Sequence, residues 1–551
     1  MDDGTTPGPL LVAGTETLLL QLDHPDADDC RLALAGFAEL ERSPGHVHTY
    51  RLTDIGLWNA KASGLDARSV LHAIEHHSGG PVPHATAILI TEAMDRFGAV
   101  TLVSVGEELR LRAASPGLLD ELLADAEVAA LAGDRRDRCS VTIAATDRGR
   151  LKLALTRLRR PADDRAALGP GRPLELRLRP EARLRPYQRD AVAAWAPAGT
   201  GVVVLPCGGG KTITALAAAA EVGAETLVLT TGQASMAQWE RELRRFTTLA
   251  DGPIDEAIGH YGTGRKEIRP ITLTTYQMLA TRRDGRYRHL GLVDDGRWGL
   301  VIYDEVHLLP AAVFSLAAGV QARRRLGLTA TLVREDGREA DVFTLIGPKR
   351  YDVPWSELEL QGWIAPATCT EIRVVPSDEE RMAHARASGQ ARARAAAATR
   401  AKLDVVARLL ERHRGEPTLI IGSYLEGLEE LAAAHDLPLV TGRTANGRRL
   451  ELFDALRRGD LATLVVSKVG NFSLDLPEVS VAIQVSGTFG SRQEEAQRLG
   501  RLLRPKADGR QAHFYTLVAR DTVEQEHSAR RQRFLAEQGY HYEIRDAADL
   551  D

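Results

Sequence analysis

The stretch GVVVLPCGGGKTIT, from Gly201 to Thr214, constrains the fold of this chain more than any other segment. Its start, Val202 to Val204, is typical of a buried strand, and the Ala-rich run after Thr214 is typical of a helix. The glycines between them let backbone N–H groups approach phosphate oxygens closely, and the helix N-terminus adds partial positive charge. Strand, glycine-rich turn, Lys-Thr and helix together predict a phosphate-binding loop in an α/β domain.

Within this loop, we expect Lys211 to reach the β- and γ-phosphates of ATP and the Thr212 hydroxyl to contact Mg²⁺. The strict pattern has a further glycine where Leu205 stands here. The alternative interpretation is a glycine-rich turn with an incidental lysine. The predicted nucleotide-binding residues of the loop are Cys207, Gly208, Gly209, Gly210, Lys211 and Thr212.

Length and composition limit the class of protein. The 551 residues suggest three or four domains of about 100–200 residues each. The four cysteines are too scattered for a metal site or a disulfide framework, which favours a reducing, cytoplasmic compartment. We expect no signal peptide and no membrane span, because no apolar run approaches the ~18 residues that a span needs. The net charge of −5 neither indicates nor excludes nucleic-acid binding, which depends on local basic tracks.

Strand-like and helix-like segments alternate regularly after Leu184, which is typical of a parallel α/β sheet. We expect strands near residues 201–206, 226–230, 271–274 and 299–303. The alternation pauses near 350–400 and resumes with TLIIGSY, so two consecutive α/β domains are predicted. The predicted organisation is a mainly helical N-terminal module at 1–125, a small α+β module at 126–180, and parallel-sheet domains at 181–366 and 367–551.

A basic, Ala-rich segment lies between the two predicted sheets. From Arg381 to Leu403 it contains arginines and a lysine but no acidic residue, and its composition predicts a helix. A solvated linker helix and a nucleic-acid contact are equally compatible with this pattern.

The second strong motif is GLVIYDEVHLL, which ends an apolar strand with acidic residues. Ligands bind beyond the carboxyl ends of strands in open α/β sheets. Asp304 is therefore expected to hold Mg²⁺ and Glu305 to orient and deprotonate the attacking water. His307 is placed to connect this site to its surroundings.

Two further motifs are informative only in combination with the others. Thr329-Ala330-Thr331 follows a predicted strand, where small hydroxyl residues can relay hydrogen bonds. In QRLGRLLRP, the side chains of Gln497, Arg501 and Arg504 share one helix face and can supply arginine fingers to a γ-phosphate. A solvated charged helix is the alternative. Upstream of the loop, the Gln188 amide suits an adenine edge.

These residues resemble a known family. LRPYQRDAV, LPCGGGKT, YDEVH, GLTATLVRED, SKVGNFSLDLPE and QRLGRLLRP are similar to the motifs of superfamily 2 DNA helicases. The DEVH sequence, the Arg334-Glu335-Asp336 triplet and the passage LIGPKRYDVPWSELELQGWIAP resemble the bacterial form of the XPB family in particular. The region HVHTYRLTDIGLWNA is similar to the N-terminal module of that family.

The resemblance implies two RecA-like helicase domains and a role for each motif residue. Arg185 and Gln188 would recognise adenine, Asp475 would approach the ribose, and Gln497 would complete the site with Arg501 and Arg504. Thr329 and Thr331 would couple hydrolysis to DNA, together with His307 and the triplet Arg334, Glu335 and Asp336. The resemblance also implies a damage-recognition region at 140–180 and a thumb-like insertion at 376–400, where this chain is short.

The function implied is ATP-driven, Mg²⁺-dependent 3′-to-5′ unwinding of DNA in repair, by a bacterial, nucleoid-associated protein. Expected partners are single-stranded or forked DNA and an unidentified repair nuclease or transcription/repair protein. Two alternatives remain: a duplex translocase or annealing motor that does not separate strands, and a non-catalytic DNA-binding scaffold. The presence of Lys211, Glu305 and Arg501 argues against the scaffold.

Overall fold

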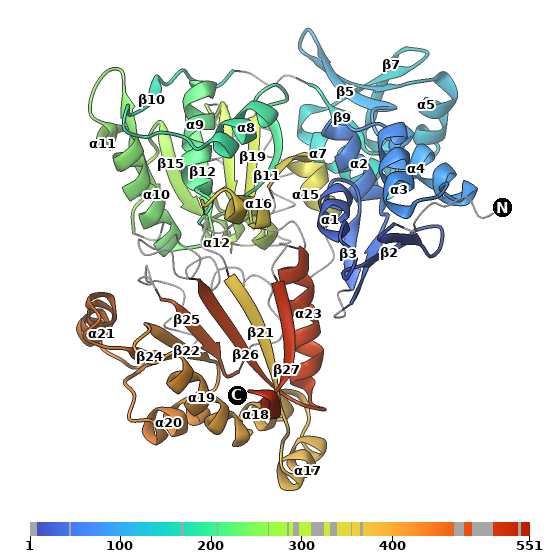
Figure 1. The fold of residues 1–551 in the computed structure, drawn as a ribbon. Coiled ribbons are helices and arrows are strands. Elements are labelled where there is room, and N and C mark those ends of the chain that lie inside the picture. The colour runs from blue at the N-terminus through green and yellow to red at the C-terminus, as the bar shows by residue number, and fades with distance from the viewer. Residues whose placement is uncertain are drawn as a thin grey trace, which may run out of the picture. The chain divides into compact units, whose positions relative to one another are not determined.

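The computed structural model of the chain describes residues 8–42, 46–166, 170–206, 208–262, 264–283, 286–289, 292, 297–309, 324–330, 339–353, 355–363, 367–467, 479–486, 511–537 and 541–550. The chain divides into two compact units. The first comprises Met1–Glu39, Tyr50–Leu205 and Gly210–Val353, and the second comprises Leu40–Thr49, Pro206–Gly209 and Pro354–Asp551. Figure 1 labels the helices and strands of both.

The first unit contains a seven-stranded sheet in the order β14-β15-β12-β18-β19-β11-β20. All its neighbouring strands run parallel, as the alternating sequence pattern predicts. The strands predicted near 201, 226, 271 and 299 are confirmed. The strands are β11 (Thr200–Val204), β12 (Thr226–Thr230), β14 (Ile258–Tyr261), β15 (Ile271–Thr275), β18 (Leu300–Asp304), β19 (Arg324–Thr329) and β20 (Lys349–Asp352).

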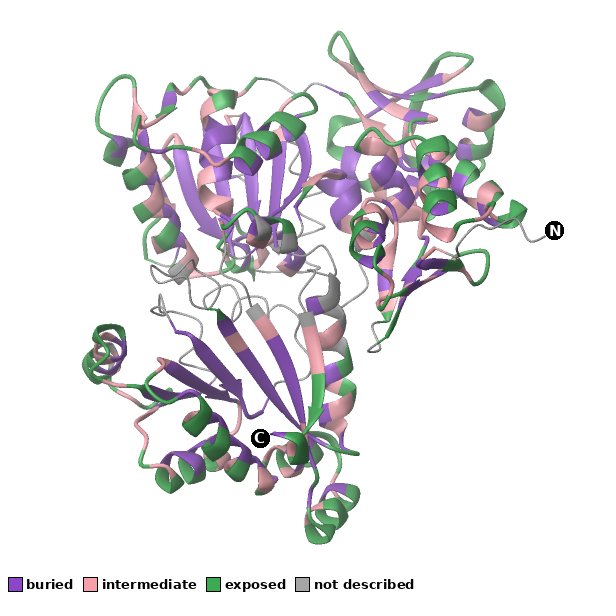
Figure 2. Cartoon of the chain, in the orientation of Figure 1, coloured by how far each residue is buried: buried purple, intermediate pink, exposed green. Residues whose placement is uncertain are grey.

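Central strands of this sheet are buried along their whole length, as Figure 2 shows. Their apolar side chains, such as Val202, Leu227 and Val301, form the core of the unit. The helices that accompany the sheet are α8 (Pro186–Trp195), α9 (Lys211–Val222), α10 (Gln233–Phe246), α11 (Ile254–Ala257), α12 (Tyr276–Ala280) and α15 (Glu339–Leu345). Two strand pairs lie outside it: β10 (Leu176–Leu178) with β13 (Thr247–Leu249), and β16 (Arg282–Arg283) with β17 (Arg286–Tyr287).

The N-terminal region mixes helices and strands, so its prediction as mainly helical is incomplete. Thr53 caps α2, because its hydroxyl accepts a hydrogen bond from the Gly56 N–H at 3.0 Å and the helix begins at the next residue. The elements are β1 (Leu10–Val12), β2 (Thr17–Gln21), α1 (Ala27–Ala35), β3 (Glu39–Arg42), β4 (Val47–Arg51), α2 (Asp54–Ala62), α3 (Ala67–Ser78) and α4 (His84–Arg96).

A five-stranded sheet, in the order β7-β8-β6-β5-β9, crosses the predicted boundary between residues 125 and 126. That boundary is therefore wrong: β5 and β6 precede it, but they form one core with the strands and helix that follow it. The elements are β5 (Val100–Val105), β6 (Glu108–Ala113), α5 (Pro116–Leu123), α6 (Ala126–Leu131), β7 (Ala132–Asp137), β8 (Ser140–Ile143), α7 (Arg148–Arg157) and β9 (Ala162–Asp164).

A buried charge cluster joins this small sheet to the large one. Asp164, on β9, accepts hydrogen bonds from Arg148 and from Lys152 Nζ (3.0 Å) on α7, and from Arg325 Nη2 (3.2 Å) on β19. All four side chains are at most 6% exposed. Although burial opposes ionisation, the three cations hold the pKa of Asp164 well below its usual range. Burial lowers the pKa of Lys152 to about 7.

The second unit contains another seven-stranded parallel sheet, in the order β23-β24-β22-β25-β26-β21-β27. The prediction of two α/β parallel-sheet domains is thus confirmed at this level. The strands are β21 (Ala367–Val374), β22 (Thr418–Gly422), β23 (Leu439–Val440), β24 (Thr463–Ser467), β25 (Val481–Gln484), β26 (Ala512–Ala519) and β27 (His541–Asp546). The helices are α16 (Trp355–Leu360), α17 (Asp378–Arg386), α18 (Gly389–Ala397), α19 (Ala401–Arg412), α20 (Leu425–Ala434), α21 (Asn446–Arg458) and α23 (Val523–Glu537).

The basic segment 381–403 is not one helix, which corrects the prediction. It covers the end of α17, all of α18 and the start of α19. The first break falls at Ala387, which is extended, and Gly389, whose φ of +52° is left-handed. Alanine-rich composition indicates helix but does not reveal such a break.

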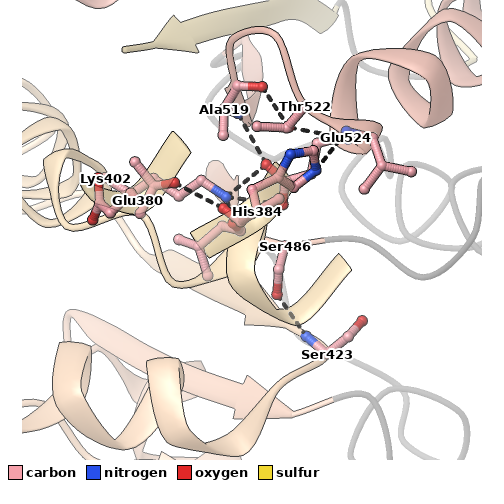
Figure 3. A network of polar contacts seen from close by, with 12 residues as sticks. Glu380, His384, Lys402, Ser423, Ser486, Ala519, Thr522 and Glu524 are labelled. Carbon is pink, nitrogen blue, oxygen red and sulfur yellow. Dashed lines mark hydrogen bonds and ion pairs between the residues drawn. The ribbon is translucent and has the colours of Figure 1, made fainter. Parts of the chain in front are cut away.

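A buried lysine connects helices to strands in the second unit, as Figure 3 shows. Lys402 Nζ, on α19, donates to the Glu524 carboxylate at 2.8 and 2.9 Å and to the Val485 carbonyl at 2.9 Å. Glu524 also accepts from the Ala519 N–H at 2.9 Å. The pair therefore holds the start of α19 and α23 against the carboxyl ends of β25 and β26.

We predict that Asp164→Asn destabilises the first unit by about 3–5 kcal/mol, because it leaves three buried cations without their carboxylate. Urea unfolding of the full chain measures this. Glu175→Gln is the control, since Glu175 pairs with Arg177 at 3.2 Å and both side chains are at least 67% exposed. The control should change stability by about 1 kcal/mol at most. Equal effects of the two substitutions would contradict a structural role for the cluster.

Candidate nucleotide site

The predicted phosphate-binding loop leads from β11 into α9. Gly208 and Gly210 have φ values of +81° and +79°, a left-handed conformation that favours glycine. A Cβ on Gly210 would lie 2.3 Å from Gln188 Nε2, so the Gln188 side chain would have to shift if a larger residue stood there. Gly210 precedes α9 and makes no side-chain cap, so the first-turn N–H groups of α9 are suited to phosphate oxygens.

Lys211 is the first residue of α9, and its Nζ lies 2.9 Å from Glu305 Oε1 at the end of β18. The two side chains are 12% and 16% exposed. Burial opposes ionisation of Glu305, but the charges of Lys211 and His307 outweigh it and keep the pKa of Glu305 below its usual value. The two residues with the clearest predicted roles are therefore in direct contact.

The backbone of Glu305 is itself unusual. Its φ of +49° is left-handed, which is uncommon for a residue other than glycine. Such conformations recur at functional sites, where the surrounding structure holds them. Here the conformation turns the chain sharply after β18, between Asp304 and Val306.

Asp304 is held by two side chains of α10. Its Oδ2 accepts hydrogen bonds from Ser235 Oγ and Trp239 Nε1, each at 2.9 Å. Burial raises the pKa of Asp304 to about 6, and the charge of Glu305 adds to this. Tyr276 Oη donates to the Asp304 carbonyl at 2.7 Å. The carboxylate is thus fixed in orientation at the strand end.

His307 links the acidic motif to the next strand. Its Nδ1 lies 2.7 Å from Thr329 Oγ1, at the end of β19, and 3.6 Å from Glu305 Oε2. Both His307 and Thr329 are buried. A movement at the end of β18 would therefore displace the end of β19 as well, and the reverse, as a coupling role requires.

Gln188 lies beside the loop, at the start of α8. Its Oε1 accepts from the Arg185 N–H at 2.9 Å, and Thr212 follows Lys211 in the first turn of α9. The structure thus brings together the predicted residues Gln188, Gly210, Lys211, Asp304, Glu305, His307 and Thr329. Arg185, Gly208, Gly209 and Thr212 are described as well, at the starts of α8 and α9 and in the loop between β11 and α9. The remaining predicted residues lie outside the described residues: Cys207, Thr331, Arg334, Glu335, Asp336, Asp475, Gln497, Arg501 and Arg504.

Ser235 and Trp239 were not predicted from the sequence. They lie four residues apart on α10, so they share one helix face. The same spacing is found in any amphipathic helix, so it does not indicate a site. No sequence motif reveals that the Trp239 indole N–H donates to the carboxylate of Asp304, which lies 65 residues away in the chain.

The residues present fit a magnesium nucleotide. Mg²⁺ is usually held by one or two carboxylates together with substrate phosphates and waters, so a single oriented Asp304 and the Thr212 hydroxyl suffice. The described residues contain no group of three or more His, Cys, Asp or Glu arranged for a metal ion. Among these residues, no helix is long and apolar enough to span a bilayer.

A glycine-rich loop at a helix N-terminus, with a lysine that contacts the glutamate of an Asp-Glu pair at the end of β18, defines a P-loop nucleoside-triphosphate-binding protein. Three family descriptions match the chain. Residues 181–334 match the type III restriction enzyme res subunit, 358–549 the ERCC3/RAD25/XPB C-terminal helicase, and 10–137 a helicase conserved C-terminal domain.

Relatives match over nearly the whole length. The chain is 53% identical to the DNA 3′-5′ helicase XPB of Kineococcus radiotolerans, covering 99% of this chain and 98% of that protein. It is 52% identical to the protein of the same name from Mycobacterium tuberculosis, covering 99% of each. It is 33% identical to the general transcription and DNA repair factor IIH helicase/translocase subunit XPB of Antonospora locustae, covering 97% of this chain and 80% of that one. The chain belongs to the XPB family of DNA helicases.

We predict that Trp239→Phe lowers ATP hydrolysis by about 10- to 100-fold while the chain stays folded, because Asp304 loses a partner that orients it. Steady-state hydrolysis at saturating Mg²⁺ measures this. Trp298→Phe is the matched control, since the buried Trp298 indole donates to the Leu292 carbonyl instead. Hydrolysis that falls equally in both variants would assign the loss to packing rather than to Asp304.

Proposed function

We propose that this chain is an ATP-dependent DNA helicase or translocase that moves 3′-to-5′ and acts in DNA repair. The observation that carries the proposal is the contact of Lys211 with Glu305 beside the oriented Asp304. The full-length similarity to proteins named DNA 3′-5′ helicase supports the polarity and the substrate. We assign 181–366 and 367–551 as the two helicase domains.

Each residue of the described site has a distinct role in this mechanism. The N–H groups at the start of α9 bind phosphate oxygens, and Lys211 neutralises the β- and γ-phosphates. Glu305 orients the attacking water and accepts its proton, which requires its carboxylate to separate from Lys211. Asp304 and Thr212 would hold Mg²⁺, which when bound neutralises charge on the phosphates. Gln188 and Arg185 recognise the adenine.

The proposed roles of the second helicase domain rest on sequence motifs. Asp475 approaches the ribose, and Gln497, Arg501 and Arg504 complete the site on the γ-phosphate side. His307 and Thr329 transmit the state of the nucleotide to DNA, together with Thr331 and the triplet Arg334, Glu335 and Asp336. The DNA would be single-stranded or forked, and a repair nuclease or transcription factor would be a further partner.

A motor that translocates on duplex DNA without separating strands would use the same nucleotide site. A non-catalytic scaffold is disfavoured, because binding alone requires neither the Lys211–Glu305 pair nor an oriented Asp304.

We predict that single-stranded DNA stimulates ATP hydrolysis and that the chain displaces a strand from duplexes with a 3′ tail but not a 5′ tail. Lys211→Ala should nearly abolish both activities, because the phosphates lose their main cation. Hydrolysis and tailed-duplex displacement assays measure these effects. Stimulated hydrolysis without displacement on either tail would favour the duplex translocase. Wild-type turnover in the variant would refute the site.

We predict that Arg501→Ala binds ATP with modest loss but hydrolyses it about 10³-fold more slowly, with or without DNA. An arginine finger stabilises charge that develops only in the transition state, so it affects turnover more than affinity. ATP titration and DNA-stimulated turnover of the variant separate the two effects. Unchanged turnover would show that the QRLGRLLRP motif is a solvated helix face and not part of the site.

A further inference from the structure

A polar cavity interrupts the core face of the second sheet. Parallel sheets are normally covered on both faces by apolar side chains. In β21, Ile372 lies opposite Leu517 of β26, and both belong to the core. Two and four residues earlier on the same face, the register instead pairs Thr370 with Tyr515 and Thr368 with His513. This face therefore changes from apolar to polar toward the amino ends of its strands.

The cavity has a volume of about 280 Å³. It is lined by the amino-terminal halves of β21 and β26, by Glu543 and Arg545 of β27, and by the end of α19; the three strands lie side by side in Figure 1. Ligands of open parallel sheets, including the nucleotide site of the first unit, lie at the carboxyl ends of the strands. This cavity lies at the opposite end, so it is not explained by the helicase motifs.

A chain of hydrogen bonds fixes the polar groups of the cavity. Glu416 Oε1 lies 2.9 Å from His413 Nδ1, and His413 Nε2 lies 2.9 Å from Tyr515 Oη. In the neutral imidazole, the Glu416 carboxylate accepts the Nδ1 proton and Nε2 accepts the Tyr515 O–H. Arg412 in turn hydrogen-bonds to Tyr515. His413 and Tyr515 are 7% and 6% exposed, so this is a rigid, pre-organised wall.

The charge of the cavity lining is positive. Among the described lining residues, Arg412 and Arg545 contribute two guanidinium groups and Glu543 contributes one carboxylate, which is paired with Arg545 at 2.7 Å. Arginine N–H groups form a planar fork that matches phosphate oxygens. The hydroxyls of Thr368 and Thr370 add neutral donors. The lining is therefore suited to an anion.

Three aromatic rings at the cavity indicate that the ligand carries a planar group as well as an anion. The centroids of His413 and His513 are 4.9 Å apart, and Tyr515 lies 5.5 Å from His413 and 6.2 Å from His513. Such faces can stack with a planar group. One water molecule occupies roughly 30 Å³ in the liquid, and the cavity volume is many times larger. The cavity therefore has room for a phosphate and an attached group.

We propose that this cavity is a second ligand site, which binds a nucleoside monophosphate through Arg412 and Arg545 and stacks its base on the imidazole and phenol rings. The site stands apart from the proposed helicase function, because it shares no residue with the nucleotide site of the first unit.

Calorimetric titration of the full-length chain with AMP tests this proposal. Mg²⁺ and a non-hydrolysable ATP analogue are present at saturation, so that the first site is filled. One equivalent of AMP should bind, and the Lys211→Ala variant should bind it equally, even if the helicase assignment fails. Arg412→Gln and Arg545→Gln should each weaken binding about tenfold or more, because each removes a charged hydrogen-bond donor.

Arg414→Gln is the matched control. Arg414 lies just beyond α19, pairs with Glu411, and is 78% exposed outside the cavity lining. This variant should bind AMP like the wild type. Arg412 and Arg545 are both exposed, so both variants should fold, and either substitution alone carries the test.

Inorganic phosphate and adenosine complete the test. Each should bind more weakly than AMP, because each supplies only half of the contacts. Equal affinity for phosphate and AMP would overturn the stacking part of the proposal. No AMP binding beside the bound analogue, or AMP binding that all the arginine variants retain, would overturn the site itself.

Discussion

The nucleotide site depends on one ion pair, between Lys211 at the start of α9 and Glu305 at the end of β18. Lys211 follows β11 and Glu305 follows β18, and both strands run parallel to the β19 strand between them, so the two residues lie at the carboxyl edge of the sheet. In this state the two charges neutralise each other. In the proposed mechanism, phosphate competes with Glu305 for Lys211, so binding of the nucleotide would also free the carboxylate to act on water.

The cluster around Asp164 gives the first unit a second constraint. It fixes β9 of the small sheet to the first residues of β19, whose last residue, Thr329, contacts His307. One strand therefore connects the small module with the acidic motif. Helix α2 adds a further tie, because its Asn59 side chain accepts the Lys349 N–H of β20 at 2.8 Å. The N-terminal modules and the first large sheet thus form one framework.

Local features of the fold were predictable from the sequence, and long-range pairings were not. The strand-loop-helix pattern identified Lys211, and apolar runs located β11, β12, β15 and β18. Asp164 and Trp239 carry no such pattern, since their partners lie far away in the chain. The boundary at 125 failed because a composition change does not report which strands pair. The polar face of the second sheet was not predictable, because His513 and Thr368 become neighbours only when β26 and β21 pair in this register.

The most direct test of this account is the affinity of Glu305→Gln for a non-hydrolysable ATP analogue, compared with the wild type. If Lys211 must leave Glu305 to reach the phosphates, removing the carboxylate charge releases the lysine, and the variant binds the analogue more tightly. Lys211→Ala should bind it poorly in the same assay. Weaker binding by Glu305→Gln than by the wild type would contradict the competition and assign Glu305 a structural role.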